Sequence, residues 1–254
     1  MLFIHGFGAS SYSWQRILPH LSKTNRLLLV DLKGHGASPK PFDSAYSLRD
    51  QADLVADFIE QHDLQDMTLV GHSMGGGVAL LLALKFAAQA RNRVSSLILI
   101  DTVAYSQRLP RFIRLLRAPL LGRLITAITP TRLQVRLVLK RAYFEQRRIT
   151  DETVAAYSAP LRLPGANHAL LETAKQIVPM DIEEISAQYA ALKMPSLIIW
   201  GSHDQVISLD IGRRLNRALP NSRLAIIEES GHIPQEETPD KALTEILQFL
   251  ESTR

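Results

Sequence analysis

The sequence contains no cysteine, and this absence excludes several classes of protein. None of its 254 residues could form a disulfide, act as a thiol nucleophile or bind a metal through sulfur. No apolar run approaches the roughly 18–20 residues that a membrane-spanning helix needs. The first residues show no basic stretch followed by a long apolar stretch, so we expect no signal peptide. Together these absences predict a cytoplasmic protein.

Aromatic residues are also few, at 6% of the chain, and the charge is unevenly spread. Lys and Arg occur eleven times between residues 108 and 148, but this window holds a single acid, Glu145. The formal net charge of the whole chain is only +4, so the remainder is acidic. Nucleic-acid-binding proteins are more often basic along a whole face, with aromatic side chains among the cations. We therefore expect no nucleic-acid partner.

The 46% hydrophobic content and the length fit one large α/β domain, or such a domain with an insertion. Short runs rich in Leu, Ile and Val alternate with helical patterns, and these runs are typical of strands buried on both faces. The alternation predicts a mostly parallel sheet flanked by helices. The expected strands lie at 2–4, 26–31, 67–70, 96–100, 196–200 and 223–227, and the expected helices at 13–21, 47–62, 74–90, 209–219 and 239–250.

This alternation breaks between about residues 103 and 190. The stretch is punctuated by prolines and contains no convincing strand. We therefore predict a core α/β domain made of residues 1–103 and 191–254, with residues 104–190 inserted as a helical cap at one edge of the sheet. Short helices are expected in the cap at 109–117, 132–144, 151–159, 166–176 and 181–192.

The strongest local motif is Gly71-His72-Ser73-Met74-Gly75, which lies between an expected strand and an expected helix. This is the G-x-S-x-G pattern in the strand–turn–helix context that it requires. So sharp a turn strains the serine backbone and crowds positions 71 and 75, where only glycine fits. The turn exposes the Ser73 hydroxyl at the start of a helix, whose free N–H groups favour a nearby oxyanion. Ser73 is therefore the candidate nucleophile.

A serine nucleophile needs a base and an acid that orients the base. Among the eight histidines His232 is the best base, because it follows the last expected strand, where open α/β sheets bind their ligands. Asp204 follows the preceding strand and is the preferred acid. Asp101, at the end of another strand, is the alternative. The chain order Ser73, Asp204, His232 is the order expected for a fold built around this motif.

In these features the chain resembles the α/β-hydrolase-fold serine hydrolases, in particular their capped esterase- and lipase-like branch. The resemblance covers nearly the whole chain. His5-Gly6-Phe7-Gly8 resembles the oxyanion-loop motif of the family, and residues 31–38 resemble the glycine-rich turn after the next strand. The serine, aspartate and histidine loops follow in the family's order. The resemblance implies that the backbone N–H groups of Phe7 and Met74 form the oxyanion hole.

The chain departs from the family at its start. Family members usually carry two strands, often antiparallel, before the strand that ends in the His-Gly motif, whereas this sequence begins within that strand. The resemblance therefore leads us to expect that these N-terminal strands are missing. Their loss would leave an exposed sheet edge, which favours aggregation.

No cofactor and no metal are expected. Residues 6–11 imitate a dinucleotide-binding fingerprint, and Asp31 follows about twenty residues later, but Ser11 stands where the third glycine belongs. Phosphate binding depends on all three glycines and on the helix that follows them. The zinc-protease, EF-hand and phosphate-loop motifs are absent from the sequence as well.

The sequence thus predicts a serine hydrolase that cleaves a carboxylic ester, or a related small acyl compound, through an acyl-enzyme. Within the same family, a hydrolase of C–C bonds in ring-cleavage products is the main alternative, and thioesterase or cofactor-free haloperoxidase activity also stays open. A different class is a hydrolase-like protein that binds a ligand without turning it over. The acyl length and the oligomeric state do not follow from the sequence.

The basic window supports two interpretations. Arg108, Arg111, Arg114 and Arg117 recur every three residues, so on a helix they spread over a broad polar face. In the first interpretation this is a solvated face whose arginine stems cover apolar surface. In the second, the cap approaches an anionic membrane surface or steers acidic substrates toward the pocket.

Overall fold

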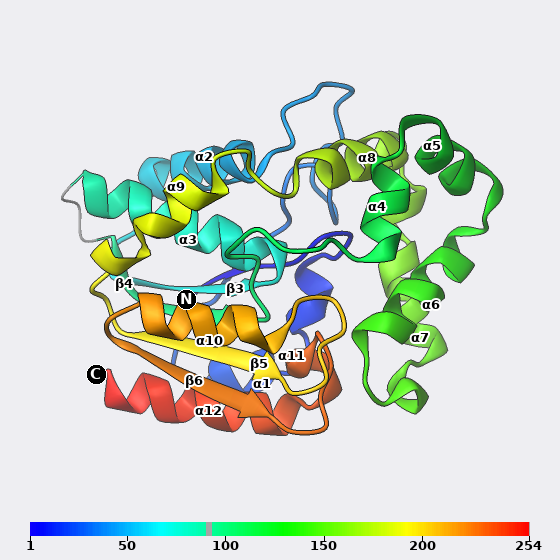
Figure 1. The fold of residues 1–254 in the computed structure, drawn as a ribbon. Coiled ribbons are helices and arrows are strands. Elements are labelled where there is room, and N and C mark those ends of the chain that lie inside the picture. Colours follow the sequence, from blue (N-terminus) through cyan, green and yellow to red (C-terminus); the bar gives the residue numbers. More distant parts are fainter. Residues whose placement is uncertain (90–92, 254) are drawn as a thin grey trace.

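The backbone forms a six-stranded sheet in which all strand pairs are parallel (Figure 1). The structure is a computed structural model and describes residues 1–89 and 93–253. The strand order is β2-β1-β3-β4-β5-β6. The predicted fold class, a mostly parallel sheet flanked by helices, is therefore confirmed. The strands are β1 (Leu2–Ile4), β2 (Leu28–Val30), β3 (Met67–His72), β4 (Val94–Ile100), β5 (Ser196–Gly201) and β6 (Ser222–Ile227).

Two hydrophobic cores cover the two faces of the sheet. Because successive strand residues point to opposite faces, Leu97 and Leu99 of β4 belong to one core, and Ile98 and Ile100 belong to the other. Burial on both faces explains why the strands are nearly continuous in apolar residues. Helices α2 (Leu48–Gln61), α3 (Met74–Ala88) and α10 (Leu209–Ala218) cover the first face, and α1 (Leu18–Leu21) and α12 (Pro239–Ser252) cover the second.

The structure corrects one predicted helix of the core. In place of a single helix over 13–21, the chain forms a 3-10 turn at Ser11–Trp14 and then the separate helix α1. Pro19 lies in the first turn of α1, where its missing N–H is tolerated, whereas it would interrupt a continuous helix. The other predicted strands and helices of the core are present, and most of them begin or end a few residues from the predicted positions. Ala90, the predicted end of the helix after Ser73, lies outside the described residues.

Residues 101–195, all of them described, contain helices and loops but no strand. One helix, α5, is not among those predicted; most of its residues are apolar, and Arg123 is its single charged residue. We term α4–α9 the helical segment; the limits of a separate cap at 104–190 stay a prediction. Within the described residues, no helix is long and apolar enough to span a bilayer. The helices of the helical segment are α4 (Arg111–Arg117), α5 (Pro119–Ile128), α6 (Thr131–Ala142), α7 (Asp151–Ser158), α8 (Ala166–Gln176) and α9 (Ile182–Ala187).

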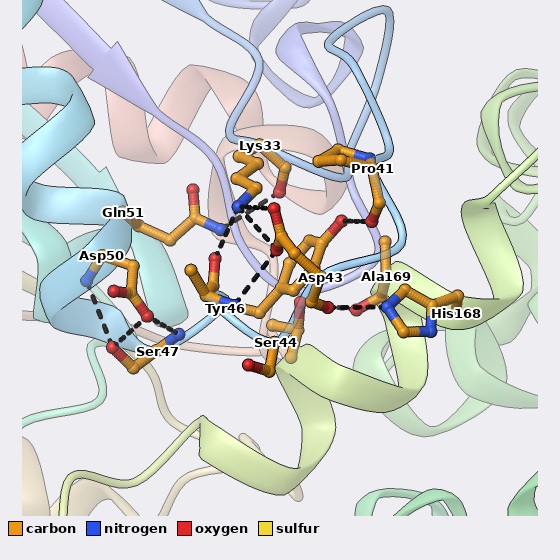
Figure 2. A network of polar contacts seen from close by, with 12 residues as sticks. Lys33, Pro41, Asp43, Ser44, Tyr46, Ser47, Asp50, Gln51, His168 and Ala169 are labelled. Atoms are coloured by element: carbon orange, nitrogen blue, oxygen red, sulfur yellow. Dashed lines mark hydrogen bonds and ion pairs between the residues drawn. The ribbon is translucent and has the colours of Figure 1, made fainter.

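A polar network joins the loop after β2 to the helical segment (Figure 2). The Asp43 carboxylate lies 2.8 Å from the Lys33 ammonium, and the Asp43 backbone oxygen accepts a hydrogen bond from His168 Nε2 on α8 at 2.7 Å. Tyr46 donates to the backbone oxygen of Pro41 at 2.6 Å in the same loop. These bonds hold the loop against α8, so His168 has a structural role.

Candidate active site

Ser73 lies at the turn between β3 and α3 in a conformation that few residues other than glycine adopt. Its φ is +54°, and a backbone conformation of this kind costs on the order of 1–3 kcal/mol. A Cβ at position 71 would lie 2.5 Å from the backbone oxygen of Gly75, and a Cβ at position 75 would collide with the backbone oxygen of Ile4. Backbone atoms therefore leave no room for a Cβ at positions 71 and 75, and only glycine fits there.

Three side chains from three loops meet at the carboxyl edge of the sheet. His232 Nε2 lies 2.9 Å from Ser73 Oγ, and His232 Nδ1 lies 2.7 Å from Asp204 Oδ2. Ser73 and His232 are buried, and the Asp204 side chain is fully shielded from solvent. Because the strands are parallel, the loops after β3, β5 and β6 all emerge at this edge. The structure thus brings the predicted nucleophile, base and acid into hydrogen-bonding contact.

The hydrogen bonds of Asp204 decide which oxygen faces the histidine. Asp204 Oδ1 accepts the N–H groups of Val206 at 2.6 Å and Ile207 at 3.0 Å, which leaves Oδ2 for His232. Burial alone raises the pKa of Asp204, but His232 and the hydrogen bonds outweigh burial, and the net pKa lies below its usual value. Asp204 is therefore an acceptor-only carboxylate, so His232 carries its proton on Nδ1 and offers Nε2 to the serine hydroxyl.

Asp101, the alternative acid, lies beside Asp204, and no hydrogen bond joins it to His232 in the described structure. It is completely buried, and its Oδ1 accepts the N–H of Gly201 at 3.1 Å. Burial, followed by the negative charge of Asp204, raises the pKa of Asp101 well above its usual value. Asp101 is therefore a neutral acid next to a carboxylate and offers the histidine no charge.

Asp101, Asp204 and His232 also place one possible ligand atom each within 4.8 Å of one another, as a metal site would. The chemistry of this donor set does not suit a metal. Metal ligands must be deprotonated, but burial keeps Asp101 neutral, and both ring nitrogens of His232 are engaged by Asp204 and Ser73. We therefore assign no metal to this cluster.

The predicted oxyanion donors, the N–H groups of Phe7 and Met74, lie on the loop after β1 and at the start of α3. Direct pairing of β1 with β3 sets these two segments side by side. A Cβ at Gly6 would lie 3.1 Å from the Cβ of Ser73, which shows how closely the first loop approaches the serine. Within the described residues neither N–H donates to another group. Both are therefore available to bind an oxygen atom.

A cavity of about 300 Å³ opens beside Ser73 and His232. Most of its lining is apolar and comes from the loops after β1 and β4 and from the helical segment. Gln107, Gln134 and Tyr157 are among its few polar members, and no Lys, Arg, Asp or Glu of the described chain lines it. A smaller cavity of about 240 Å³ between α5 and α8 contains none of the predicted site residues.

Two other histidines near Ser73, His72 and His5, are held neutral by burial. His72 Nε2 donates to the backbone oxygen of His232 at 2.8 Å, and burial lowers the pKa of His72 to about 3. His5 is completely buried, its Nε2 accepts the N–H of Leu32 at 3.0 Å, and burial lowers its pKa as well. Both residues therefore fix the loops around the site, and His232 alone contacts the serine hydroxyl.

The loop of His232 is tied to the helical segment through Glu237, which sequence reasoning missed. One Glu237 oxygen accepts the N–H of Gly231 at 2.7 Å, and the other accepts the N–H of Glu145 at 2.6 Å. The N–H of His232 donates to the backbone oxygen of Ala142 at the end of α6, at 2.6 Å. Glu237 belongs to a short helix, α11 (Pro234–Glu237), whose charged residues would normally indicate a solvated surface. The sequence therefore carries no clear signal for this role.

Glu236, also on α11 (Pro234–Glu237), is buried among tyrosines. It accepts hydrogen bonds from the hydroxyl of Tyr157 and, at 3.3 Å, from the hydroxyl of Tyr143. Burial raises the pKa of Glu236 to about 7, against the opposing effect of both hydrogen bonds. Because Tyr157 also lines the cavity, Glu236 supports one wall of it.

We expect Glu236 to make the protein less stable as the pH rises from 4.5 to about 7. The folded state binds this proton more tightly than the unfolded state, so the contribution is complete below the unfolded pKa and lost as the pH passes the folded pKa. The pKa difference corresponds to roughly 3 kcal/mol. Urea unfolding at about pH 5 and about pH 8 measures this effect. Between these pH values the free energy of unfolding of the wild type should fall further than that of Glu236→Gln, by roughly 3 kcal/mol. Equal losses in the two proteins would contradict this assignment.

Residues 1–239 match the family described as alpha/beta hydrolase fold. The chain belongs to this family, and its class is therefore that of a hydrolase. It is 27% identical to the uncharacterized hydrolase YugF of Bacillus subtilis, over 98% of this chain and 89% of the relative. It is 27% identical to Lipase 1 of Psychrobacter immobilis, over 95% of this chain and 73% of the lipase.

Among solved structures, a meta-cleavage product hydrolase from Pseudomonas fluorescens matches with a TM-score of 0.82. The match covers 100% of this chain and 90% of that chain, at 22% identity. At so low an identity the likeness concerns the fold alone. The names of these proteins refer to different reactions. The reaction of this chain must therefore be inferred from its own site.

Proposed function

We propose that the protein is a serine hydrolase that cleaves a carboxylic ester through an acyl-enzyme. The observation that carries the proposal is the position of the His232 ring, 2.9 Å from Ser73 Oγ on one side and 2.7 Å from Asp204 Oδ2 on the other. This is the relation of nucleophile, base and orienting acid that activates a serine hydroxyl. Family membership and the Psychrobacter lipase add support.

In the proposed reaction, Ser73 Oγ attacks the ester carbonyl while its proton passes to His232 Nε2. Asp204 stabilises the imidazolium and keeps its Nδ1–H in place. The N–H groups of Phe7 and Met74 bind the oxyanion of the tetrahedral intermediate. The imidazolium then protonates the departing alcohol, leaving the acyl group on Ser73. Water, deprotonated by His232, attacks this acyl-enzyme and releases the carboxylic acid.

The composition of the cavity favours an ester of an apolar acid over an acidic ring-cleavage product. A dienone that carries a carboxylate would need a cationic or strongly polar partner, because burial of an unpaired charge is costly. No Lys or Arg of the described chain lines the cavity, whereas Leu, Ile, Val and Phe side chains dominate it. C–C bond hydrolysis nevertheless stays the second candidate, since a 2-hydroxymuconate semialdehyde hydrolase is 25% identical over 92% of this chain.

A panel of p-nitrophenyl esters tests the proposed substrate class. Each methylene buried in an apolar pocket contributes about 0.8 kcal/mol, so we expect kcat/KM for the butyrate to exceed that for the acetate on the order of tenfold. The mono-p-nitrophenyl ester of succinic acid, which ends in a carboxylate, should be a poorer substrate than the butyrate. Preference for the succinate, or cleavage of a ring-cleavage dienone without any ester turnover, would favour the C–C hydrolase. No turnover of any substrate would favour a binding protein.

The proposal also assigns residues 104–190 as a cap over the site. Leu116 on α4, Ile125 on α5 and Leu170 on α8 line the cavity that contains Ser73. The helical segment therefore supplies much of the surface that an acyl group would contact. In this arrangement the sheet carries the reacting groups and the cap determines which acyl groups fit.

A further inference from the structure

The outer side of α5 carries apolar side chains where a surface helix ordinarily carries polar ones. Leu120, Leu124 and Ile128 follow one another at intervals of four, so they lie along one face of the helix. Their exposed fractions are 83%, 54% and 69%. The buried positions of α5 are instead Gly122 and Thr126. This helix therefore turns its apolar face to solvent.

The neighbouring helices extend this apolar surface. Leu115 on α4 and Leu133 and Leu137 on α6 are also exposed. Gln134 on α6 donates to the backbone oxygen of Thr129, just after α5, at 2.7 Å, which joins α6 to α5. The three helices lie together at one end of the molecule (Figure 1). We term the outward-facing surface of α4, α5 and α6 the outer cap face.

The outer cap face is also strongly cationic. Between Asp101 and Glu145 the sequence holds Lys and Arg residues but no acid. Arg132 and Arg136 are compensated by Asp151 on α7. None of the remaining cations of α4, α5 and α6 lies within 4 Å of an acidic group of the described chain. These uncompensated cations are Arg111, Arg114, Arg117, Arg123, Lys140 and Arg141.

The cavity beside Ser73 reaches this same face. Leu115 and Leu137 both line the cavity, yet their exposed fractions are 43% and 58%. A side chain that is exposed and also lines a cavity marks its opening. An acyl chain lying against the outer cap face could therefore enter the cavity beside Leu115 and Leu137.

We propose that the outer cap face docks on the surface of an anionic lipid bilayer. Exposed leucines beside uncompensated arginines are the combination that lets a helix lie in a membrane interface: the leucines enter the acyl boundary, and the cations bind the acidic headgroups. Nucleic acid would leave the leucines without a partner. A second copy of this chain would bring like charges together across the two-fold axis of a dimer. Delivery of a lipid-like ester from the bilayer to Ser73 rests on the proposed function, but docking itself does not.

Sedimentation with lipid vesicles tests docking without any catalytic readout. We expect the full-length protein to bind vesicles of phosphatidylglycerol and phosphatidylcholine more tightly than vesicles of phosphatidylcholine alone, with binding weakened by high salt. Each arginine near an anionic surface contributes about fivefold, so Arg114→Gln/Arg117→Gln/Arg123→Gln should lower the partition coefficient on the order of 100-fold. Leu120→Ser/Ile128→Ser should lower it by about tenfold or more, because two large apolar side chains no longer enter the interface.

Matched controls change the same chemistry elsewhere on the surface. Lys23→Gln/Lys193→Gln/Arg217→Gln removes three exposed cations away from the outer cap face, and Leu54→Ser/Met180→Ser removes two exposed apolar side chains. We expect both control variants to bind like the wild type, and all four variants to hydrolyse a soluble ester normally. Ser73→Ala should also bind vesicles normally, which separates docking from catalysis.

Three results would overturn the proposal. The first is equal binding of the wild type to neutral and anionic vesicles, and the second is equal losses in the outer-cap-face and control variants. The third is a concentration-dependent dimer, seen by analytical ultracentrifugation, that Leu120→Ser/Ile128→Ser abolishes, because the face would then bind a second copy. If the wild type bound vesicles but hydrolysed no ester, only the proposed function would be overturned.

Discussion

Replacing Ser73 by alanine is expected to lower kcat/KM for p-nitrophenyl butyrate on the order of 10³–10⁶-fold. The hydroxyl that His232 faces at 2.9 Å is then absent, so no acyl-enzyme can form. A fluorophosphonate probe provides a direct measurement, since it labels an activated serine covalently. The wild type should be labelled at Ser73, and the variant should not be labelled.

Ser10→Ala is the matched control for this experiment. Ser10 is another serine on a loop at the carboxyl edge of the sheet, and its Oγ accepts only a weak hydrogen bond from the N–H of Tyr12. We expect this variant to keep wild-type labelling and turnover. Labelling that persists in Ser73→Ala, at any site, would reject Ser73 as the nucleophile.

Asp204→Asn is expected to lower kcat/KM on the order of 10³–10⁴-fold with little change in fold. In the wild type, Oδ1 accepts the N–H groups of Val206 and Ile207, and an asparagine oxygen would keep these bonds. The asparagine NH₂ group would then face His232 Nδ1 and donate to it. The histidine proton would then have to lie on Nε2. A protonated Nε2 cannot accept the proton of Ser73. Circular dichroism and urea unfolding should match the wild type, which would exclude loss of the fold as the cause.

Asp101→Asn is the control for the acid, because Asp101 is already neutral in the folded protein. We expect its kcat/KM to stay within about tenfold of the wild type, since the charge beside His232 is unchanged. The Asn oxygen can still accept the N–H of Gly201. If Asp101→Asn lost more activity than Asp204→Asn, the orienting acid would have to be reassigned to Asp101.

The sheet and the three contacting side chains were predictable because their signals are local. Strands buried on both faces must be apolar throughout, and the crowded turn at Ser73 admits only glycine at positions 71 and 75. His232 and Asp204 each follow a strand, and parallel strands deliver such loops to one edge. The choice of Asp204 over Asp101 needed only this rule and the order of the loops. Which of the two carboxyls is charged depends on burial and on their mutual distance, and neither quantity is present in the sequence.

Other features depend on tertiary contacts that leave no local pattern. Helix α5 buries Gly122 and Thr126 and leaves its leucines in solvent, so its apolar residues do not mark the side that faces the core. The short helix with Glu236 and Glu237 resembles an ordinary charged surface turn, yet both carboxyls are buried and bonded to groups far away in the chain. These cases share one cause: the partner that determines the structure is distant in sequence.

The bonds between the His232 loop and the end of α6 bear on how a protein of this kind changes its specificity in evolution. Because His232 donates to Ala142, and Glu237 also accepts from Glu145, the helical segment is not an interchangeable module. A segment transplanted from a relative would displace the base unless it reproduced both the acceptor and the donor. We therefore expect new acyl specificities to arise by stepwise substitution in α4, α5 and α8. These helices line the cavity and, within the described residues, share no hydrogen bond with the histidine loop.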